Sequence, residues 1–131
     1  MKFPCMFACA FLTLLVGCTT MSRSDKERYR ELQGLGVRAN DRQTKNPGAA
    51  GALNILPGIG NFYLAVGTDE SEQWLYGCLN LLCWPVSVVW GIPEAAIDAN
   101  TINKKETVYY YTFDPIGRKE LERLKAAQKD L

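Results

Sequence analysis

The sequence has no histidine among its 131 residues. This absence removes the commonest general base near neutral pH and the commonest metal ligand. Cysteine is also scarce beyond residue 18, where only Cys78 and Cys83 occur. On a helix these two would face directions about 140° apart, which disfavours a disulfide between them. We therefore expect two small packing residues and no metal site, and we find no phosphate-binding loop or nucleophile elbow in the sequence.

Basic residues are missing from the centre of the chain. Residues 46–103 contain no lysine or arginine and five acidic residues. Residues 19–45 carry seven basic and four acidic residues, and residues 104–131 carry seven and five. This distribution gives an apolar, acidic centre between basic flanks. Because no concentrated basic face is present, we expect no nucleic-acid partner.

The N-terminus carries Lys2, an apolar run from Cys5 to Val16, and a small residue before a cysteine. Its last four residues, Leu15-Val16-Gly17-Cys18, resemble the lipobox of bacterial lipoproteins, so we expect a signal peptide over residues 1–17. The resemblance implies cleavage before Cys18, a diacylglycerol on its sulfur and a third acyl chain on its amine, with no other cofactor. The alternatives are an ordinary secretory signal or an uncleaved anchor, and the run is shorter than the ~20 residues that a spanning helix needs.

Helix signals suggest how the rest of the chain is organised. We expect a lipidated N-terminus, a charged helix and a polar linker over residues 18–46, followed by a single small domain over residues 47–131. The charged helix should begin at the capping box Ser24-Asp25-Lys26-Glu27 and end near Gly34. Its few apolar residues favour a solvated tether.

The first apolar segment, residues 48–67, should start a helix at Asn46-Pro47, with asparagine as the cap and proline at the first position. Pro57 should break this helix, which predicts two short helical pieces. Gly58 and Gly60 after the break should allow another backbone to come close.

The second apolar segment, residues 74–93, is long enough for a membrane span and carries no charge. Pro85 should kink it. An acidic turn over residues 68–72 precedes it and should cap it. Membrane contact and a globular helical core both remain open for this segment.

Three elements are expected in the C-terminal part. A helix from Glu94 to Asn103 should be opened by Pro93. The run Thr107–Phe113 is β-branched or aromatic throughout, which favours a short strand. Asp114-Pro115 should begin an amphipathic helix over residues 115–130. The expected fold is thus mainly α: a small Gly/Pro-interrupted helical hairpin over residues 47–103, one short β-strand over residues 107–113 and a C-terminal amphipathic helix.

The run LPGIGNFYL at residues 56–64, followed by Trp90 and Ile97-Asp98, resembles the TM2-domain family of membrane hairpins. The resemblance implies a close-packed two-helix hairpin with small residues at the contact, and it implies no activity. We expect hairpin packing or membrane contact from Gly58, Gly60, Phe62, Tyr63, Trp74, Trp84 and Trp90.

The two resemblances conflict over topology. Basic residues on both sides of the hairpin would place both its ends in the cytoplasm, whereas a lipidated Cys18 lies outside it. We give priority to the lipobox and expect the hairpin to pack in the interface, in an oligomer or as a globular core. Thr19, directly after the cysteine, resembles lipoproteins exported to the outer membrane, so we expect the periplasmic face of that membrane.

Glu94 and Asp98 form the only pair of carboxylates in an apolar setting. Spaced four apart, they could share a proton or bind a cation. We expect instead solvated acids that complement the start of a helix after Pro93.

These observations predict a small lipid-anchored protein of the bacterial envelope with a structural or interaction role, and no enzyme. Its expected partners are membrane lipid and an envelope protein or a second copy of the chain. The alternative is a lysis or exclusion lipoprotein of phage or plasmid origin that disturbs membranes through its hairpin.

Overall fold

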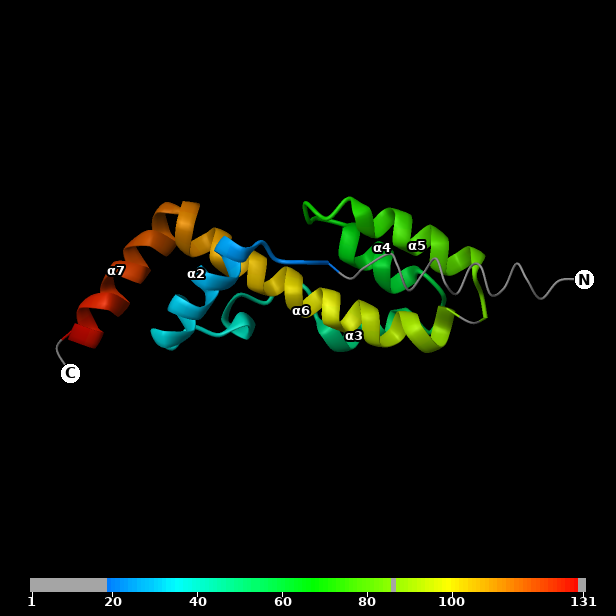
Figure 1. The fold of residues 1–131 in the computed structure, drawn as a ribbon, viewed down its shortest axis with the longest axis horizontal. Helices are drawn as coiled ribbons and strands as arrows, with labels where there is room; N and C mark the ends of the chain where they lie inside the picture. The colour runs from blue at the N-terminus through cyan, green and yellow to red at the C-terminus, as the bar shows by residue number, and fades with distance from the viewer. Residues whose placement is uncertain (1–18, 86, 130–131) are drawn as a thin grey trace, which may run out of the picture. The chain divides into compact units, whose positions relative to one another are not determined.

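A computed structural model describes residues 19–129 with the exception of residue 86. The predicted signal peptide and Cys18 lie outside the described residues. Every regular element in the described part is helical, which confirms the mainly α class (Figure 1). The chain divides into two compact units. Among the described residues, the hairpin unit comprises residues 19–20 together with Lys45–Asn100, and the flanking unit comprises Met21–Thr44 and residues 101–129.

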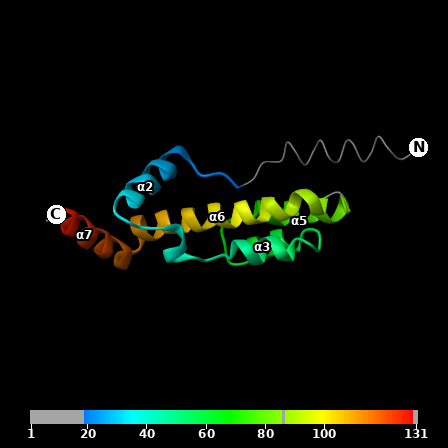
Figure 2. The same ribbon diagram turned by 90° about the horizontal axis from the view of Figure 1, so that it is seen from below.

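The hairpin unit contains three short helices and the first part of a long one. These are α3 (Pro47–Leu53), α4 (Ile59–Ala65), α5 (Glu72–Leu82) and the start of α6 (Ser87–Phe113). Helix α4 packs against both α3 and α5 (Figures 1 and 2). The predicted start of α3 is confirmed, since Asn46 accepts the amide hydrogen bond of Ala49 and Pro47 is the first helical residue.

The prolines interrupt the apolar segments. The break predicted at Pro57 is confirmed, because α3 ends before it and α4 begins after it. Pro85 ends a helix rather than kinking one: α5 stops at Leu82, and the cis Trp84–Pro85 peptide lies in the link to α6. No helix in the described residues combines the length and the apolar character that crossing a membrane requires.

The predicted helix from Glu94 to Asn103 is wrong at both ends, because α6 begins at Ser87 and runs to Phe113. Pro93 therefore lies inside a helix instead of opening one. Pro93 is the seventh residue of α6, beyond the first four amides that have no partner within a helix, so the carbonyl of Val89 lacks its usual amide partner and the proline ring crowds that turn.

The predicted strand over Thr107–Phe113 is also wrong, because these residues form the C-terminal end of α6. An isolated strand would leave its backbone amides without partners, whereas the helix pairs them internally. Helical spacing also buries Val108 and Tyr111 on one side and leaves Tyr109 and Phe113 exposed on another. Strand propensity reflects the fit to a neighbouring surface, and here that surface is helical.

The flanking unit begins with α2 (Arg23–Gly34), and the helix end predicted at Gly34 is confirmed. The predicted cap at Ser24 is wrong: Ser22 accepts the amide hydrogen bond of Asp25 at 3.1 Å. The prediction of a solvated tether is wrong as well. Tyr29 and Leu32 are buried in a cluster completed by Val37, Ala39, Val108 and Tyr111.

The remaining elements of the flanking unit pack on this cluster. A 3-10 turn, η1 (Ala39–Arg42), lies in the segment that the sequence presents as a polar linker. Helix α7 (Pro115–Lys129) packs through Leu121 and Leu124. Its predicted start is confirmed, because Asp114 accepts hydrogen bonds from the amides of Ile116 and Gly117 at 2.7 and 3.3 Å.

Candidate functional site

The interior of the hairpin unit is built from carboxamide side chains. Asn54, Asn61, Gln73 and Asn80 are all buried, and they come from α5, α4 and the residue that ends α3. The side-chain oxygen of Asn61 accepts hydrogen bonds from Asn80 at 2.9 Å and from Asn54 at 3.2 Å. The amide nitrogen of Asn61 donates to Gln73 at 2.9 Å. Asn61 therefore joins α4 to the end of α3 and to two positions on α5 through one side chain.

Asn54 also holds two backbones together. Its side-chain nitrogen donates to the carbonyl of Gly91 at 2.5 Å, and its oxygen accepts the amide hydrogen bond of Gly60 at 3.1 Å. A β-carbon on Gly60 would collide with the carbonyl of Ala50. The close approach predicted for Gly60 is thus confirmed, and it brings α4 within reach of the Asn54 carboxamide.

The carboxamide cluster ends at a carboxylate. Asp98 is fully buried, and its Oδ2 accepts a hydrogen bond from Gln73 Nε2 at 2.6 Å. Its Oδ1 accepts the backbone amide hydrogen bond of Thr19 at 2.8 Å, and Gln73 Nε2 lies 2.7 Å from the Thr19 hydroxyl. Among the described residues, no buried side-chain nitrogen or oxygen lacks a hydrogen-bond partner. These contacts fasten the residue after Cys18 to the interior of the hairpin unit.

Glu94 lies one helical turn before Asp98 and is buried too. Burial, followed by the negative charge of Asp98, raises the pKa of Glu94 to about 7. Burial also raises the pKa of Asp98, although its hydrogen bonds with Gln73 and Thr19 act in the opposite direction. The prediction that both acids are solvated at a helix start is wrong, because α6 starts earlier and turns both carboxyls inward.

The predicted packing residues fall into two groups. Gly58 has a φ of 82°, and a β-carbon there would collide with the carbonyl of Gly77 on α5. The ring of Phe62 fills the space that a side chain at Gly77 would need, and it lies 5.4 Å from the ring of Trp74. Tyr63 Oη accepts the amide hydrogen bond of Asn46 at 3.1 Å. These residues pack within the unit.

The tryptophans differ from that first group. Trp74, Trp84 and Trp90 have exposed fractions of 51%, 64% and 46%. The structure therefore brings Gly58, Gly60, Phe62 and Tyr63 together in hairpin packing and leaves the three indole rings on the outside of the unit.

The carboxamide cluster was not among the sites predicted from the sequence. Its signal was present, since Asn54, Asn61, Gln73 and Asn80 are the only carboxamides in residues 47–93. A single polar residue in an uncharged apolar stretch indicates an inward-facing hydrogen-bonding position. Chemically, the cluster cross-links helices, and it ends at the buried carboxylate of Asp98.

The side chains that could ligate a metal ion are dispersed across the described residues. No group of three acidic or cysteine side chains in the described part of the chain is arranged to hold a metal ion. Cys78 is exposed, Cys83 is half-buried, and the two are not joined by a disulfide.

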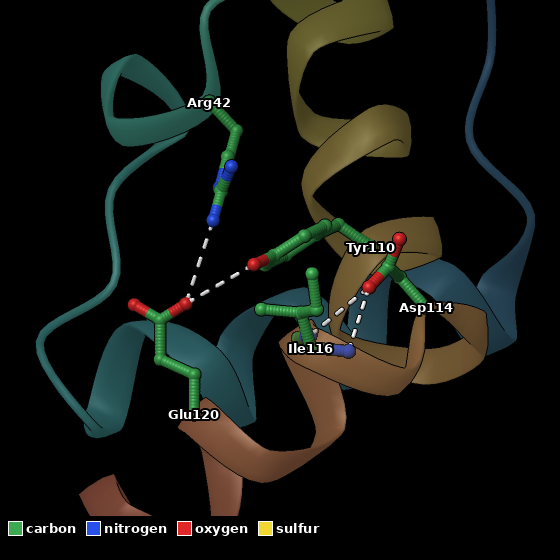
Figure 3. A network of polar contacts seen from close by, with 6 residues as sticks. Arg42, Tyr110, Asp114, Ile116 and Glu120 are labelled. Atoms are coloured by element: carbon green, nitrogen blue, oxygen red, sulfur yellow. Dashed lines mark hydrogen bonds and ion pairs between the residues drawn. The ribbon is translucent and has the colours of Figure 1, made fainter.

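The flanking unit carries a smaller polar network (Figure 3). The Arg42 guanidinium lies 3.6 Å from the centre of the Tyr110 ring, and its Nη2 lies 3.5 Å from Glu120. Glu120 also lies 3.4 Å from the Tyr110 hydroxyl. Both charged side chains are more than two-fifths exposed, so the ion pair adds little stability and chiefly orients η1 against α7.

The flanking unit also carries a small aromatic surface on α6. Tyr109 and Phe113 are 60% and 64% exposed, and their ring centres are 5.1 Å apart. These two residues are the aromatic patch of the flanking unit.

Comparison with known proteins found no match to any protein-family model, curated protein or solved structure.

Proposed function

We propose that this chain is a small lipid-anchored protein of the bacterial envelope with a structural or interaction role. The observation that carries the proposal is the hydrogen bond from the Thr19 amide to the buried Asp98 carboxylate. A lipid on Cys18 would be one peptide bond away from a residue fixed inside the fold. Acyl chains at that position hold the hairpin unit itself at the membrane, and two or three chains make such anchoring effectively permanent.

Metabolic labelling tests the lipid anchor and the membrane location of the protein. Cells that express the full chain and are supplied with radioactive palmitate should label it, and Cys18→Ser should abolish the label. Cys78→Ser is the matched control, because this exposed cysteine should leave labelling unchanged. Fractionation should then place the labelled protein in the outer membrane. Equal labelling of the Cys18→Ser variant would refute the lipid anchor.

The partner role is assigned to the aromatic patch. Clustered exposed aromatic side chains are typical of protein contact sites. A photo-crosslinking amino acid at Tyr109 or Phe113 should therefore capture a discrete envelope protein or a second copy of the chain. The same amino acid at Val108 or Tyr111, which are buried within two positions of these residues, is the control. Crosslinks that are absent at all four positions would contradict the interaction role.

The second candidate function is membrane disturbance by a phage- or plasmid-borne lysis or exclusion lipoprotein. The exposed apolar side chains of the hairpin unit favour it, and Leu82 and Val89 are the most exposed among them. Release of a trapped dye from liposomes separates the two functions. Purified protein that binds liposomes without releasing dye supports the structural role, and rapid release supports membrane disturbance.

A further inference from the structure

The hairpin unit reverses the usual placement of polar and apolar side chains. The largest of its fully buried side chains are mostly polar, and the buried apolar residues among those described are Ala50, Leu64, Ala65, Ala95 and Ala99. Many of its large apolar residues are exposed, with Leu82 and Val89 exposed by 79% and 83%. In water the buried core of a protein is apolar, whereas in lipid polar side chains face the interior of a helical unit.

The outward apolar residues belong to every part of the unit. They occur in the α3–α4 link, along α5, in the α5–α6 link and on the first part of α6, and they comprise Leu53, Ile55, Leu56, Ile59, Val66, Trp74, Leu75, Leu81, Leu82, Trp84, Val89, Trp90 and Ile97. A second protein covers one patch of a surface, while lipid covers a unit from all sides. The distribution therefore favours lipid as the occupant.

Most of the charged residues lie at one end of the unit, and Glu94 is buried one helical turn away from that end on α6. The α4–α5 turn carries Asp69, Glu70 and Glu72, and Gln73 at the start of α5 contacts Asp98. The Lys45 ammonium binds the carbonyls of Tyr63 and Val66 at the end of α4. We name these residues the charged end, and they comprise Lys45, Asp69, Glu70, Glu72 and Asp98.

The opposite end is apolar. Helices α4 and α5 are antiparallel neighbours, so the α5–α6 link lies away from the charged turn, and Figure 2 shows the α3–α4 link near the start of α6. We name the exposed residues of these links the apolar tip: Ile55, Leu56, Leu82, Trp84 and Val89. Residues 46–68 and 73–93 contain no charged residue at all.

The length of the unit fits half a bilayer. Helix α5 has 11 residues, which at 1.5 Å each reach about 16 Å, roughly half of the ~30 Å hydrocarbon core. Trp74 lies near the charged end, where an aromatic ring suits the membrane interface. Thr19, and with it the attachment point of the predicted lipid, lies at the charged end through its bond to Asp98.

We propose that the hairpin unit is seated as a wedge in a single lipid leaflet, with its apolar tip near the bilayer midplane and its charged end among the headgroups. The acyl chains of Cys18 enter the same leaflet from the headgroup level. This proposal depends on the proposed lipid anchor only for which membrane and which leaflet the unit enters. Insertion itself depends on the apolar side chains of the hairpin unit.

Depth-dependent quenching of tryptophan fluorescence tests the wedge. The full mature chain, with Cys18→Ser to remove the lipid, is reconstituted into phosphatidylethanolamine–phosphatidylglycerol vesicles as two single-tryptophan variants. One retains Trp84 and the other Trp74, and the remaining tryptophans are replaced by phenylalanine. Lipids brominated near the chain ends should quench Trp84 about twofold or more above Trp74, and lipids brominated near the carbonyls should reverse the order.

Two results of the quenching experiment would contradict the wedge. Equal quenching of both residues, or protection of both in a soluble oligomer, overturns the wedge, and the second result assigns the apolar surface to copies of the chain. Because the variant carries no lipid, a failure here leaves palmitate labelling of the native chain unaffected. Conversely, absence of palmitate labelling would refute the lipid anchor and would leave the quenching result unchanged.

A second pair of variants tests the orientation independently. Leu82→Lys places a charge at the apolar tip, and Val66→Lys places one beside the charged end at a similarly exposed apolar position. Leu82→Lys should weaken vesicle binding by about tenfold or more, while Val66→Lys changes it by less than about threefold. Equal effects of the two substitutions would contradict the orientation, and circular dichroism of both variants checks that the helices form.

Discussion

The backbone amide of Thr19 donates a hydrogen bond to Asp98, although 79 residues separate the two in the sequence. The contact is buried, and Gln73 bonds the same carboxylate and the Thr19 side chain. The stretch of chain next to the predicted lipid is thereby part of the fold. The strength of this attachment depends on one side chain, Asp98, whose removal is the first prediction.

Asp98→Ala should lower the free energy of unfolding by about 1–3 kcal/mol, because it leaves the buried donors of Thr19 and Gln73 without their acceptor. Asp98→Asn should lie between this variant and the wild type, since it keeps one acceptor oxygen. Thermal unfolding in detergent micelles measures the order, and hydrogen exchange at the Thr19 amide should quicken. Asp69→Asn, in the exposed turn, is the control and should change stability by less than about 0.5 kcal/mol. An Asp98→Ala protein as stable as the control would contradict this role.

Gly58→Ala should destabilise the hairpin unit by about 2 kcal/mol or more, because a β-carbon there collides with the Gly77 carbonyl in addition to the unfavourable φ. Gly67 provides a matched control. Its φ is also positive, at 72°, and a β-carbon there meets nothing within 4 Å. Gly67→Ala should therefore cost only the backbone strain, about 1 kcal/mol. Equal melting temperatures for the two variants would show that α4 and α5 do not depend on this close approach.

Stability should decrease as the pH rises from about 4.5 to about 7, owing to Glu94. Its pKa is about 7 in the folded protein and 4.5 for an exposed glutamate, so between these values the folded state binds more protons than the unfolded state. The direction of the Asp98 shift adds to the same trend. Glu94→Gln should remove about 1–2 kcal/mol of this pH dependence, with allowance for solvent screening. Denaturant unfolding at several pH values measures it, and unchanged profiles in the variant would assign the trend elsewhere.

Two tyrosines that lie two positions apart on α6 should differ sharply in their effect on stability. Tyr111→Ala removes a buried ring from the cluster that holds α2 to α6, which should cost about 3–5 kcal/mol. Tyr109→Ala removes an exposed ring and should cost less than about 1 kcal/mol. Chemical denaturation compares the two. A similar loss from both would mean that the end of α6 is not oriented as described.

Local sequence signals were sufficient to predict those helix ends that are determined by residues next to them in the sequence. The Asn46-Pro47 and Asp114-Pro115 starts and the break at Pro57 all follow from a cap side chain or from the missing proline amide, and the structure confirms them. The close approach at Gly58 was predictable for the same reason, because only glycine combines a positive φ with the absence of a side chain.

The rest of the fold depends on contacts distant in sequence. Thr107–Phe113 has strand propensity, but α2 offers it a helical surface through Tyr29 and Leu32. The inward orientation of Glu94 and Asp98 depends on α6 starting at Ser87, which no local cap announced. The carboxamide cluster was missed because hydrophobic periodicity assumes an apolar interior, and in the hairpin unit the interior is polar.

The carboxamide interior also bears on how this chain tolerates change over generations. An outward leucine such as Leu82 has many acceptable apolar replacements, since lipid or a loosely packed neighbour imposes no fixed shape. Asn61 has almost none, because three partners require both its donor and its acceptor in place. Related sequences with this fold should therefore conserve the buried asparagine and glutamine residues most strictly and vary at the exposed apolar positions. In most proteins the buried apolar residues are the conserved ones, so the expected pattern is reversed.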